Sequence, residues 1–228
     1  MIRRGAIIRA VLFDLDGVLF DTLGYHCRAW RRVFELRGGT IRDETVLQNE
    51  GRNTRAFLPI LMREAGVEIP PGEQEAFLEE KRRYFREILE IRPYPGASRV
   101  VAQLRERFRL GLVTGSDAQT VRLLLDAPLY RCFETIVTGD TVARTKPAPD
   151  PWLAAARQLG LTPAECLVVE NAPLGIEAAR AAGMRCIAVQ STLGAEWLSG
   201  ADSIVPEIGR VPGHPLLAPR PGERGISS

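Results

Sequence analysis

Val11-Leu12-Phe13-Asp14-Leu15-Asp16-Gly17-Val18-Leu19 joins a short apolar run to two carboxylates and a glycine. Together with Ile7 and Ile8, the run predicts a buried parallel strand over residues 7–13. Side chains alternate along a strand, so Asp14 and Asp16 would share one face where it ends. Two carboxylates that close repel each other unless a cation lies between them, and Mg²⁺ is the simplest candidate because it prefers oxygen ligands. On these residues alone, a polar turn after the strand explains the pattern equally well, because Asp-Gly is a common turn.

The composition is that of a globular protein with one large domain, or a core with an inserted smaller domain. The 228 residues are 45% hydrophobic and 25% charged, and the net charge of +2 is too small to indicate nucleic-acid binding. The four cysteines form no Cys-x-x-Cys pair, which argues against a zinc cluster or a disulfide framework. We find no signal peptide and no apolar run of the roughly 20 residues that a membrane span needs. A soluble cytoplasmic protein without membrane partners is expected.

Residues 21–93 are predicted to be helical throughout. Asp21-Thr22 can cap a helix from about Leu23 to Leu36, and further helices are expected over 43–48, 54–65 and 72–91. Strand alternation is missing from these segments. We therefore expect an inserted helical cap after the first strand.

From Pro93 onward, helices and strands are predicted to alternate. Helices are expected over about 97–107, 118–126, 151–159 and 174–182. Strands are expected over 110–113, 135–138, 166–169 and 186–189, with an edge strand at 203–205. This order predicts an α/β fold with a doubly wound, Rossmann-like parallel sheet. The expected divisions are a core of residues 1–20 and 94–206, a cap of residues 21–93 and an irregular tail of residues 207–228.

Polar residues follow several of the predicted strands, at the edge where ligands bind in open parallel sheets. They are Thr114-Gly115-Ser116, Lys146 in the loop after the 135–138 strand, and Glu170-Asn171. Each has an ordinary explanation, since Thr, Ser and Asn cap helices and most lysines are solvated. Their coincidence at one edge favours a functional site.

Phosphoryl transfer is the chemistry that suits this set of side chains. A carboxylate can act as the nucleophile, and a metal can remove its repulsion with the phosphate. A lysine and a hydroxyl can hold the remaining phosphate oxygens. A second carboxylate can protonate the leaving group and later deprotonate water. The residues therefore outline a two-step hydrolase.

The order of these motifs resembles the haloacid dehalogenase superfamily, in its branch of phosphatases and β-phosphoglucomutases with a helical cap. The resemblance covers about residues 7–205. It is carried by four segments, which are Asp14-Leu15-Asp16-Gly17-Val18, Val113-Thr114-Gly115-Ser116, Lys146-Pro147-Ala148-Pro149-Asp150-Pro151 and the stretch from Val168 to Ala179 that contains Glu170-Asn171-Ala172-Pro173.

The resemblance implies a role for each core residue. Asp14 would be the nucleophile and a Mg²⁺ ligand, and Asp16 the general acid and base, with its backbone carbonyl also on the metal. Thr114, Gly115, Ser116 and Lys146 would bind the phosphate. Glu170 and Asn171 would complete the metal site. The commonest family pattern has an acid where Asn171 stands, so weaker metal binding is expected.

The cap carries a second, weaker resemblance to β-phosphoglucomutase. His26 falls on the mutase histidine that assists phosphoryl transfer, although a surface histidine packed beside Trp30 is the ordinary explanation. The mutase's substrate-gripping arginine falls on Thr54, and its cap serine falls on Phe57. The cap residues that we predict to contact substrate are His26, Arg52, Arg55 and Lys81.

These observations favour a Mg²⁺-dependent phosphatase acting on a small phosphorylated metabolite such as a sugar phosphate. The alternative is a β-phosphoglucomutase-type sugar phosphomutase, which shares every core residue. Asp16 argues against dehalogenase and phosphonate-cleaving activities, which do not use an aspartate at this position. A binding module that kept the fold without catalysis is a further alternative. We expect hinges near Asp21 and Arg92-Pro93, so that the cap can close over the site.

Overall fold

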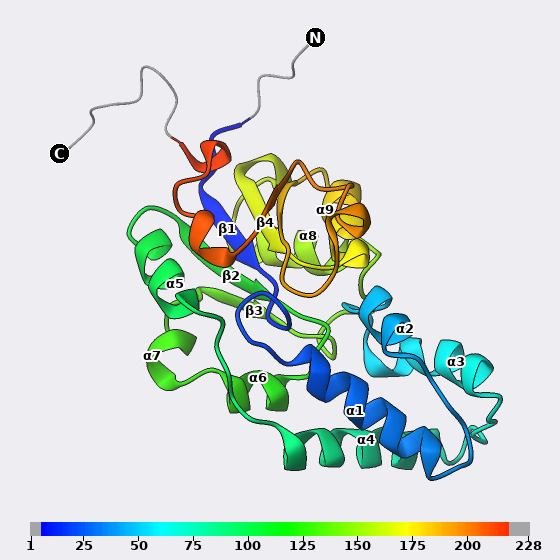
Figure 1. Ribbon diagram of the computed structural model, residues 1–228. Coiled ribbons are helices and arrows are strands. Elements are labelled where there is room, and N and C mark those ends of the chain that lie inside the picture. Colours follow the sequence, from blue (N-terminus) through cyan, green and yellow to red (C-terminus); the bar gives the residue numbers. More distant parts are fainter. Residues whose placement is uncertain (1–5, 219–228) are drawn as a thin grey trace.

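The protein is built on a six-stranded sheet in which all neighbouring strands are parallel, as the computed structural model of residues 6–218 shows (Figure 1). In spatial order the strands are β3 (Thr135–Val137), β2 (Arg109–Val113), β1 (Ala10–Phe13), β4 (Cys166–Glu170), β5 (Arg185–Val189) and β6 (Ser203–Val205). The expected α/β, Rossmann-like fold is confirmed. The first strand lies at the centre, where the strand order reverses, so its carboxyl end opens onto the usual ligand site of such sheets.

Helices cover both faces of the sheet. One face packs against α5 (Ala97–Arg105), α6 (Ala118–Leu124) and α7 (Ala127–Tyr130), and the other packs against α8 (Asp150–Gln158) and α9 (Pro173–Ala181). The alternation along β1 explains this division, because Val11 and Phe13 join the first apolar cluster while Ala10 and Leu12 join the second. Both faces are apolar, as expected for a buried parallel strand.

The helical insertion between β1 and α5, which we call the cap, is a bundle with an apolar core of its own. It contains α1 (Leu23–Glu35), α2 (Asp43–Gln48), α3 (Thr54–Ala65) and α4 (Gln74–Ile88), and α1 lies alongside α4 (Figure 1). Trp30, Phe34, Phe57 and Phe77 form the aromatic centre of the bundle, with the rings of Trp30 and Phe57 5.6 Å apart in an edge-on arrangement. Helical spacing of these apolar side chains is what gives the segment a buried face.

The chain leaves and re-enters the sheet domain at adjacent points. The Asp21 N–H donates to the Arg92 carbonyl at 2.9 Å, and the Tyr94 N–H donates to the Leu19 carbonyl at 2.9 Å. Two antiparallel connections therefore join the cap to the core, at the positions where the sequence predicted hinges.

Some boundaries differ from the sequence prediction. The first strand begins at Ala10 rather than residue 7, and Ile7 is exposed. The four-residue helix α7 was not predicted, because its only signals are the Asp126 cap and a proline in its first turn.

The segment after residue 206 was expected to be irregular, but its described part is ordered on the core. Two turns of 3-10 helix form at Ile208–Arg210 and Pro215–Leu217, and the side chains of Ile208, Val211 and Leu217 are buried. The rest of the predicted tail, residues 219–228, lies outside the described residues. Within residues 6–218, we find no helix long and apolar enough to cross a membrane.

Candidate active site

A buried ion-pair cluster occupies the carboxyl ends of β1 and β4. Lys146, from the loop before α8, places its Nζ atom 2.6 Å from Asp14 Oδ1 and 2.7 Å from Glu170 Oε1. The same ammonium donates to the Val113 carbonyl at 3.3 Å and lies 4.5 Å from the centre of the Trp152 ring. Lys146, Asp14 and Glu170 are at most 1% exposed. Segments more than a hundred residues apart thus meet at one point, as the strand-end argument predicted.

Glu170 has a partner for each of its carboxylate oxygens. Besides the Oε1 contact with Lys146, Oε2 accepts from the backbone N–H groups of Asn171 and Ala172 at 2.7 and 3.0 Å. Gly175 in the first turn of α9 makes room for the carboxylate, because a Cβ atom there would lie 1.6 Å from Glu170 Oε1. Glu170 is therefore positioned to orient and neutralise Lys146.

The charges of the cluster are unbalanced. Burial alone would lower the pKa of Lys146, but the carboxylates of Asp14, Glu170 and Glu50 outweigh it and raise that pKa, so the ammonium stays charged. Burial raises the pKa of Asp14 well above its usual range; Lys146 opposes this shift, while Glu170 and Asp16 add to it. Burial and the charge of Asp14 likewise raise the pKa of Glu50. One ammonium does not compensate these carboxylates, so a second cation would be stabilised here.

Asp16 lies beside this cluster, within a set of hydroxyl groups. Its Oδ1 accepts from Thr22 Oγ1 at 2.6 Å, and its Oδ2 accepts from Ser116 Oγ at 2.7 Å and Thr114 Oγ1 at 3.2 Å. Burial favours protonation, but hydrogen bonds from His26, Thr22 and Ser116 outweigh it and hold the pKa of Asp16 well below its usual range. Asp16 is thus ionised at neutral pH when only these groups surround it.

His26 and Lys81 reach Asp16 from the cap. Lys81 Nζ lies 2.9 Å from His26 Nδ1, and His26 Nε2 lies 3.5 Å from Asp16 Oδ1. Burial and the Lys81 charge lower the pKa of His26, so its ring is neutral. Because the ammonium can only donate, Nδ1 accepts and Nε2 carries the proton that faces Asp16. The ring also stacks on Phe85, with centroids 4.1 Å apart, which makes His26 a positioned site residue rather than a surface histidine.

A pocket lies between the cap and the core. Asp16, Gly115 and Ser116 line it from the core, and His26 and Lys81 line it from the cap. Its remaining cap wall includes Arg52, Thr54 and Phe57. A concave pocket in which a few polar side chains converge among apolar ones is typical of a small-molecule site.

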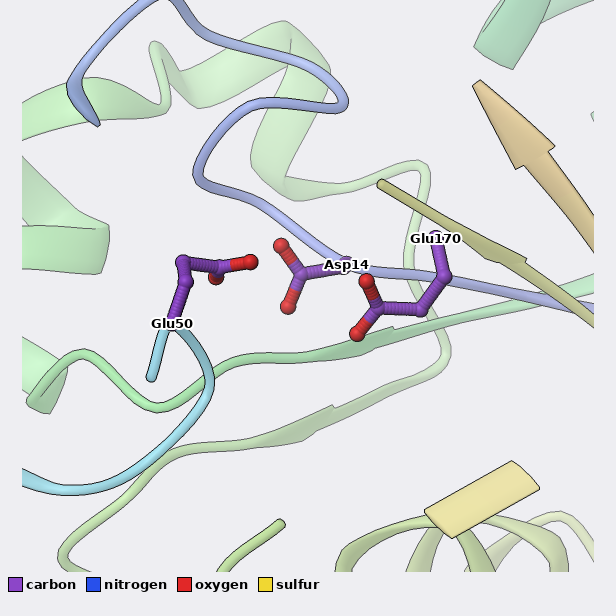
Figure 2. A group of neighbouring side chains, drawn as sticks. All are labelled: Asp14, Glu50 and Glu170. Atoms are coloured by element: carbon purple, nitrogen blue, oxygen red, sulfur yellow. The ribbon is translucent and has the colours of Figure 1, made fainter. Parts of the chain in front are cut away.

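Several buried oxygen atoms are suited to a divalent cation. Within residues 6–218, Asp14 Oδ2, Glu50 Oε2 and Asn171 Oδ1 are buried without a hydrogen-bond partner. Asp14, Glu50 and Glu170 bring carboxylate oxygens within 4.8 Å of one another, as Figure 2 illustrates. Oxygen ligands and excess negative charge are the environment that Mg²⁺ prefers. The side chains present therefore fit this metal.

Comparison with known families agrees with the geometry. The family described as haloacid dehalogenase-like hydrolase matches residues 8–183. The chain belongs to the haloacid dehalogenase-like hydrolases. The family resemblance stated from the motifs is thereby confirmed, and the protein is an enzyme of hydrolase type.

Relatives within the haloacid dehalogenase-like hydrolases include both phosphatases and phosphomutases. The chain is 32% identical over 199 residues to the β-phosphoglucomutase of Bacillus subtilis (strain 168), covering 83% of this chain and 88% of that protein. It is also 32% identical over 183 residues to the fructose-1-phosphate phosphatase YqaB of Escherichia coli (strain K12), covering 79% of this chain and 95% of the relative.

Solved structures of haloacid dehalogenase-like hydrolases share the fold. The β-phosphoglucomutase from Clostridium difficile superposes with a TM-score of 0.80 at 26% identity, covering 90% of this chain and 93% of that one. CbbY from Rhodobacter sphaeroides, solved in complex with phosphate, superposes with a TM-score of 0.76 at 27% identity, covering 90% and 96%.

Most residues predicted for this haloacid dehalogenase-like site lie together. Asp14, Asp16, Thr114, Ser116, Lys146, Glu170 and Asn171 surround the strand ends, and Gly115, His26, Arg52 and Lys81 line the pocket. Arg55 lies apart from this pocket: it is exposed and pairs with Glu75 at 2.6 Å. Arg52 precedes α3 and lines the pocket, whereas Arg55 lies in the first turn of α3 and its side chain is directed toward Glu75 on α4.

Sequence reasoning missed three residues of this haloacid dehalogenase-like site. Thr22, predicted only as a helix cap, donates to Asp16 instead. Trp152 was assigned to a helix without a role, and its spacing from Lys146 in the sequence gives no signal that its ring lies beneath the ammonium. Glu50 lies in a turn between two helices, and nothing in its local sequence shows that it faces Asp14.

Proposed function

We propose that this protein is a Mg²⁺-dependent phosphatase that hydrolyses a small sugar phosphate through a phosphoryl group carried on Asp14. The observation that carries the proposal is the contact of Lys146 with Asp14 Oδ1 at 2.6 Å. A buried cation thus sits where a phosphate dianion would otherwise be repelled by the attacking carboxylate. Charge neutralisation and positioning of this kind account for most of the catalysis of phosphoryl transfer.

In the first half-reaction, a carboxylate oxygen of Asp14 attacks phosphorus and the bond from phosphorus to the ester oxygen breaks. Asp16 gives its proton to the leaving oxygen, which departs as an alcohol. Lys146, Thr114 and Ser116 hold the phosphate oxygens. Bound Mg²⁺ would supply further neutralisation between Asp14 and the phosphate.

In the second half-reaction, water attacks phosphorus, Asp16 takes a proton from that water, and the bond between Asp14 and phosphorus breaks. Inorganic phosphate leaves, and both carboxylates return to their starting state. Asp16 is already ionised in the hydrogen-bonded arrangement described above, which is the form that accepts a proton.

The hydroxyls of Thr114 and Ser116 explain how Asp16 also acts as an acid. Both donate to Asp16 Oδ2 when no phosphate is bound. A bound phosphate competes for the same donors, and its negative charge disfavours a second anion nearby. Both effects raise the pKa of Asp16, so substrate binding itself promotes the protonated form.

The cap supplies the sugar pocket and shields the phosphoryl-Asp14 linkage from bulk water. We propose that residues 21–93 move as one unit about the paired connections at Asp21 and Arg92-Pro93. A sugar phosphate is proposed as the substrate because the pocket is lined by polar cap residues and because a relative with 32% identity is a fructose-1-phosphate phosphatase.

A sugar phosphomutase is the second candidate, favoured by Arg52. This guanidinium lines the pocket and could hold the distal phosphate of a sugar bisphosphate. Thr54 and Phe57, which occupy the positions of the mutase arginine and serine, also line the pocket and supply no charge there. This difference places the phosphatase first.

The deciding experiment measures two products from the same enzyme. The protein is incubated with Mg²⁺ and β-glucose 1-phosphate plus trace glucose 1,6-bisphosphate, and separately with a panel of sugar phosphates. Release of inorganic phosphate supports the phosphatase. Formation of glucose 6-phosphate without free phosphate supports the mutase and overturns the first proposal.

Asp14→Asn provides the control for both reactions. This variant removes the nucleophile while keeping the side-chain shape, so turnover of p-nitrophenyl phosphate should fall to background. Turnover that survives in Asp14→Asn would contradict the role of Asp14 as the nucleophile. A wild-type protein inactive on every ester with Mg²⁺ present would contradict the proposal and favour a binding module.

A further inference from the structure

Glu50 is a carboxylate that the cap places against the catalytic core. It follows α2, in the turn that leads to α3, and its carboxylate faces Asp14 from the side opposite Glu170 (Figure 2). Oxygen atoms of the three side chains lie within 4.8 Å of one another. Asp14 directly follows β1 and Glu170 is the last residue of β4, so Glu50 is the member of this group that the cap supplies.

The turn that carries Glu50 packs closely on the core. Gly51 has a φ of +91°, and a Cβ atom there would lie 2.8 Å from Lys146 Cδ. A Cβ atom on Gly115 would lie 2.9 Å from the Gly51 carbonyl. The Asn53 N–H donates to Thr145 Oγ1 at 3.3 Å. The position of Glu50 is therefore set by contacts on both sides, and glycine permits the close approach.

Free oxygen atoms converge here from both domains. In the part of the chain that the structure describes, Asp14 Oδ2 and Asn171 Oδ1 are buried without a partner on the core side, and Glu50 Oε2 is buried without a partner on the cap side. Asp14 and Asn171 are 0% exposed. Unpaired buried oxygen is costly, and oxygen atoms from separate segments are the usual ligands of a hard cation.

The charges of these side chains balance one divalent cation only when Glu50 is included. Asp14, Glu170 and the Lys146 ammonium leave one negative charge in the core, and the amide of Asn171 adds none. Glu50 brings the site to two negative charges, which match one divalent cation.

We propose that Glu50 is a ligand, supplied by the cap, for the divalent cation held at Asp14 and Asn171, so that cation binding and cap closure stabilise each other. This inference rests on the metal site of the proposed function. By linkage, the cation binds more tightly to the closed form, and the closed form is more populated when the cation is bound. Asn171 stands where the commonest family pattern has an acid, and Glu50 supplies the missing carboxylate from the cap.

The test uses Mn²⁺ as the probe, with free Mn²⁺ measured by electron paramagnetic resonance and no substrate present. Glu50→Gln keeps the size of the side chain and removes its charge. We expect its dissociation constant for Mn²⁺ to rise roughly ten-fold or more, the range found when groups that support metal ligands are altered. Glu68→Gln removes one carboxylate from an exposed position of the same cap and should bind Mn²⁺ like the wild type.

A compensating variant separates metal affinity from cap closure. Glu50→Gln combined with Asn171→Asp moves the carboxylate from the cap to the core, so Mn²⁺ affinity should recover. Hydrogen exchange of the backbone amides in residues 49–53 reports closure. Mn²⁺ should slow this exchange in the wild type and in Glu68→Gln, but not in Glu50→Gln or the double variant.

Each outcome has one interpretation. Unchanged Mn²⁺ affinity in Glu50→Gln, or protection of residues 49–53 that persists without Glu50, overturns the inference and leaves the proposed phosphatase intact. A wild-type protein that binds no Mn²⁺ overturns the metal site itself, and with it both the inference and the metal dependence of the proposed function.

Discussion

At the scale of single residues, the site gives different surroundings to two aspartates that are two positions apart in the sequence. Asp14 faces a buried ammonium and further carboxylates, whereas Asp16 faces hydroxyls and the His26 ring. These different surroundings suit the roles that the proposed function gives to the two side chains, Asp14 as the nucleophile and Asp16 as the proton carrier.

Asp16→Asn tests the proton-carrying role. The amide keeps an oxygen for the Thr22 or Ser116 hydroxyl but cannot donate a carboxylic proton or accept one from water. We expect kcat to fall by roughly 10²–10⁴, the usual contribution of a general acid or base, with far-ultraviolet circular dichroism unchanged. A normal kcat in this variant would remove Asp16 from the mechanism.

Lys81 is a buried ammonium that costs the folded state free energy. It is 4% exposed, and within residues 6–218 it has no carboxylate within ion-pair distance; burial lowers its pKa from 10.5 to about 8. Lys81→Met keeps the length and apolar stem of the side chain. We expect it to raise the free energy of unfolding at pH 7 by about 2–3 kcal/mol, from the size of the pKa shift, while lowering kcat because His26 loses its donor.

The pH dependence of this gain follows from the direction of the shift. Between pH 8 and 10.5 the unfolded chain binds a proton at Lys81 that the folded chain does not, so wild-type stability rises with pH relative to Lys81→Met. The difference between the two proteins, measured by urea denaturation, should be largest at and below pH 7 and vanish near pH 10.5. A difference that stays constant across this range would contradict the assignment.

At the scale of elements, the site depends on where strands end and helices begin. The first turn of α9 approaches the end of β4 so closely that only Gly175 leaves room for Glu170, and the Trp152 Nε1–H donates to the Gly175 carbonyl at 3.2 Å. Helices α8 and α9 therefore hold the ring under Lys146 and the carboxylate beside it in one rigid arrangement.

Gly175→Ala tests this packing. The added methyl would overlap the Glu170 carboxylate and push it away from Lys146. We expect a loss of about 1–3 kcal/mol in the free energy of unfolding, which is typical of an overpacked core, together with a large fall in kcat. Gly24→Ala places the same methyl in the first turn of α1, where Arg28 Nη1 at 3.8 Å is the one neighbour within 4 Å.

For Gly24→Ala we expect unchanged or slightly higher stability, by about 0.5–1 kcal/mol, because alanine is the better helix former. Equal effects of the two substitutions in guanidinium denaturation would show that the contact between Gly175 and Glu170 is unimportant.

At the scale of the whole molecule, the cap lies closed on the core. Arg86 Nη1 donates to Gln119 Oε1 at 3.2 Å, and Arg82 Nε lies 3.8 Å from Asp117 Oδ2, which adds polar contacts to those of the 49–53 turn. These contacts are exposed or half-buried, and such pairs contribute little to stability. Weak contacts of this kind allow a cap to open and close.

Magnesium should stabilise the whole fold by linkage. An ion that binds only the folded chain, present at 100 times its dissociation constant, raises the free energy of unfolding by about 2.7 kcal/mol. For a chain of this size, that corresponds to a rise of roughly 5–11 °C in the unfolding midpoint. Differential scanning calorimetry with Mg²⁺ and with a chelator measures the effect. An equal shift in Asp14→Asn would show that the ion binds elsewhere.

The sequence by itself determined the sheet and the cap insertion, and it predicted which polar residues follow the strands. Short apolar runs such as Val11-Leu12-Phe13 are typical of parallel strands buried on both faces, and Asp14, Thr114 and Glu170 follow such runs directly. Because parallel strands end at the same edge of a sheet, the sequence alone predicts that the polar residues following these strands lie close together.

Only the tertiary structure decided which cap residues face the site. Glu50, Arg52 and Arg55 are near neighbours in the chain, yet Glu50 faces Asp14, Arg52 lines the pocket and Arg55 pairs with Glu75 on the exposed surface. The direction of a side chain in a turn between helices depends on how the whole bundle docks on the sheet. That docking is set by contacts between distant residues, and no local pattern in the sequence records it.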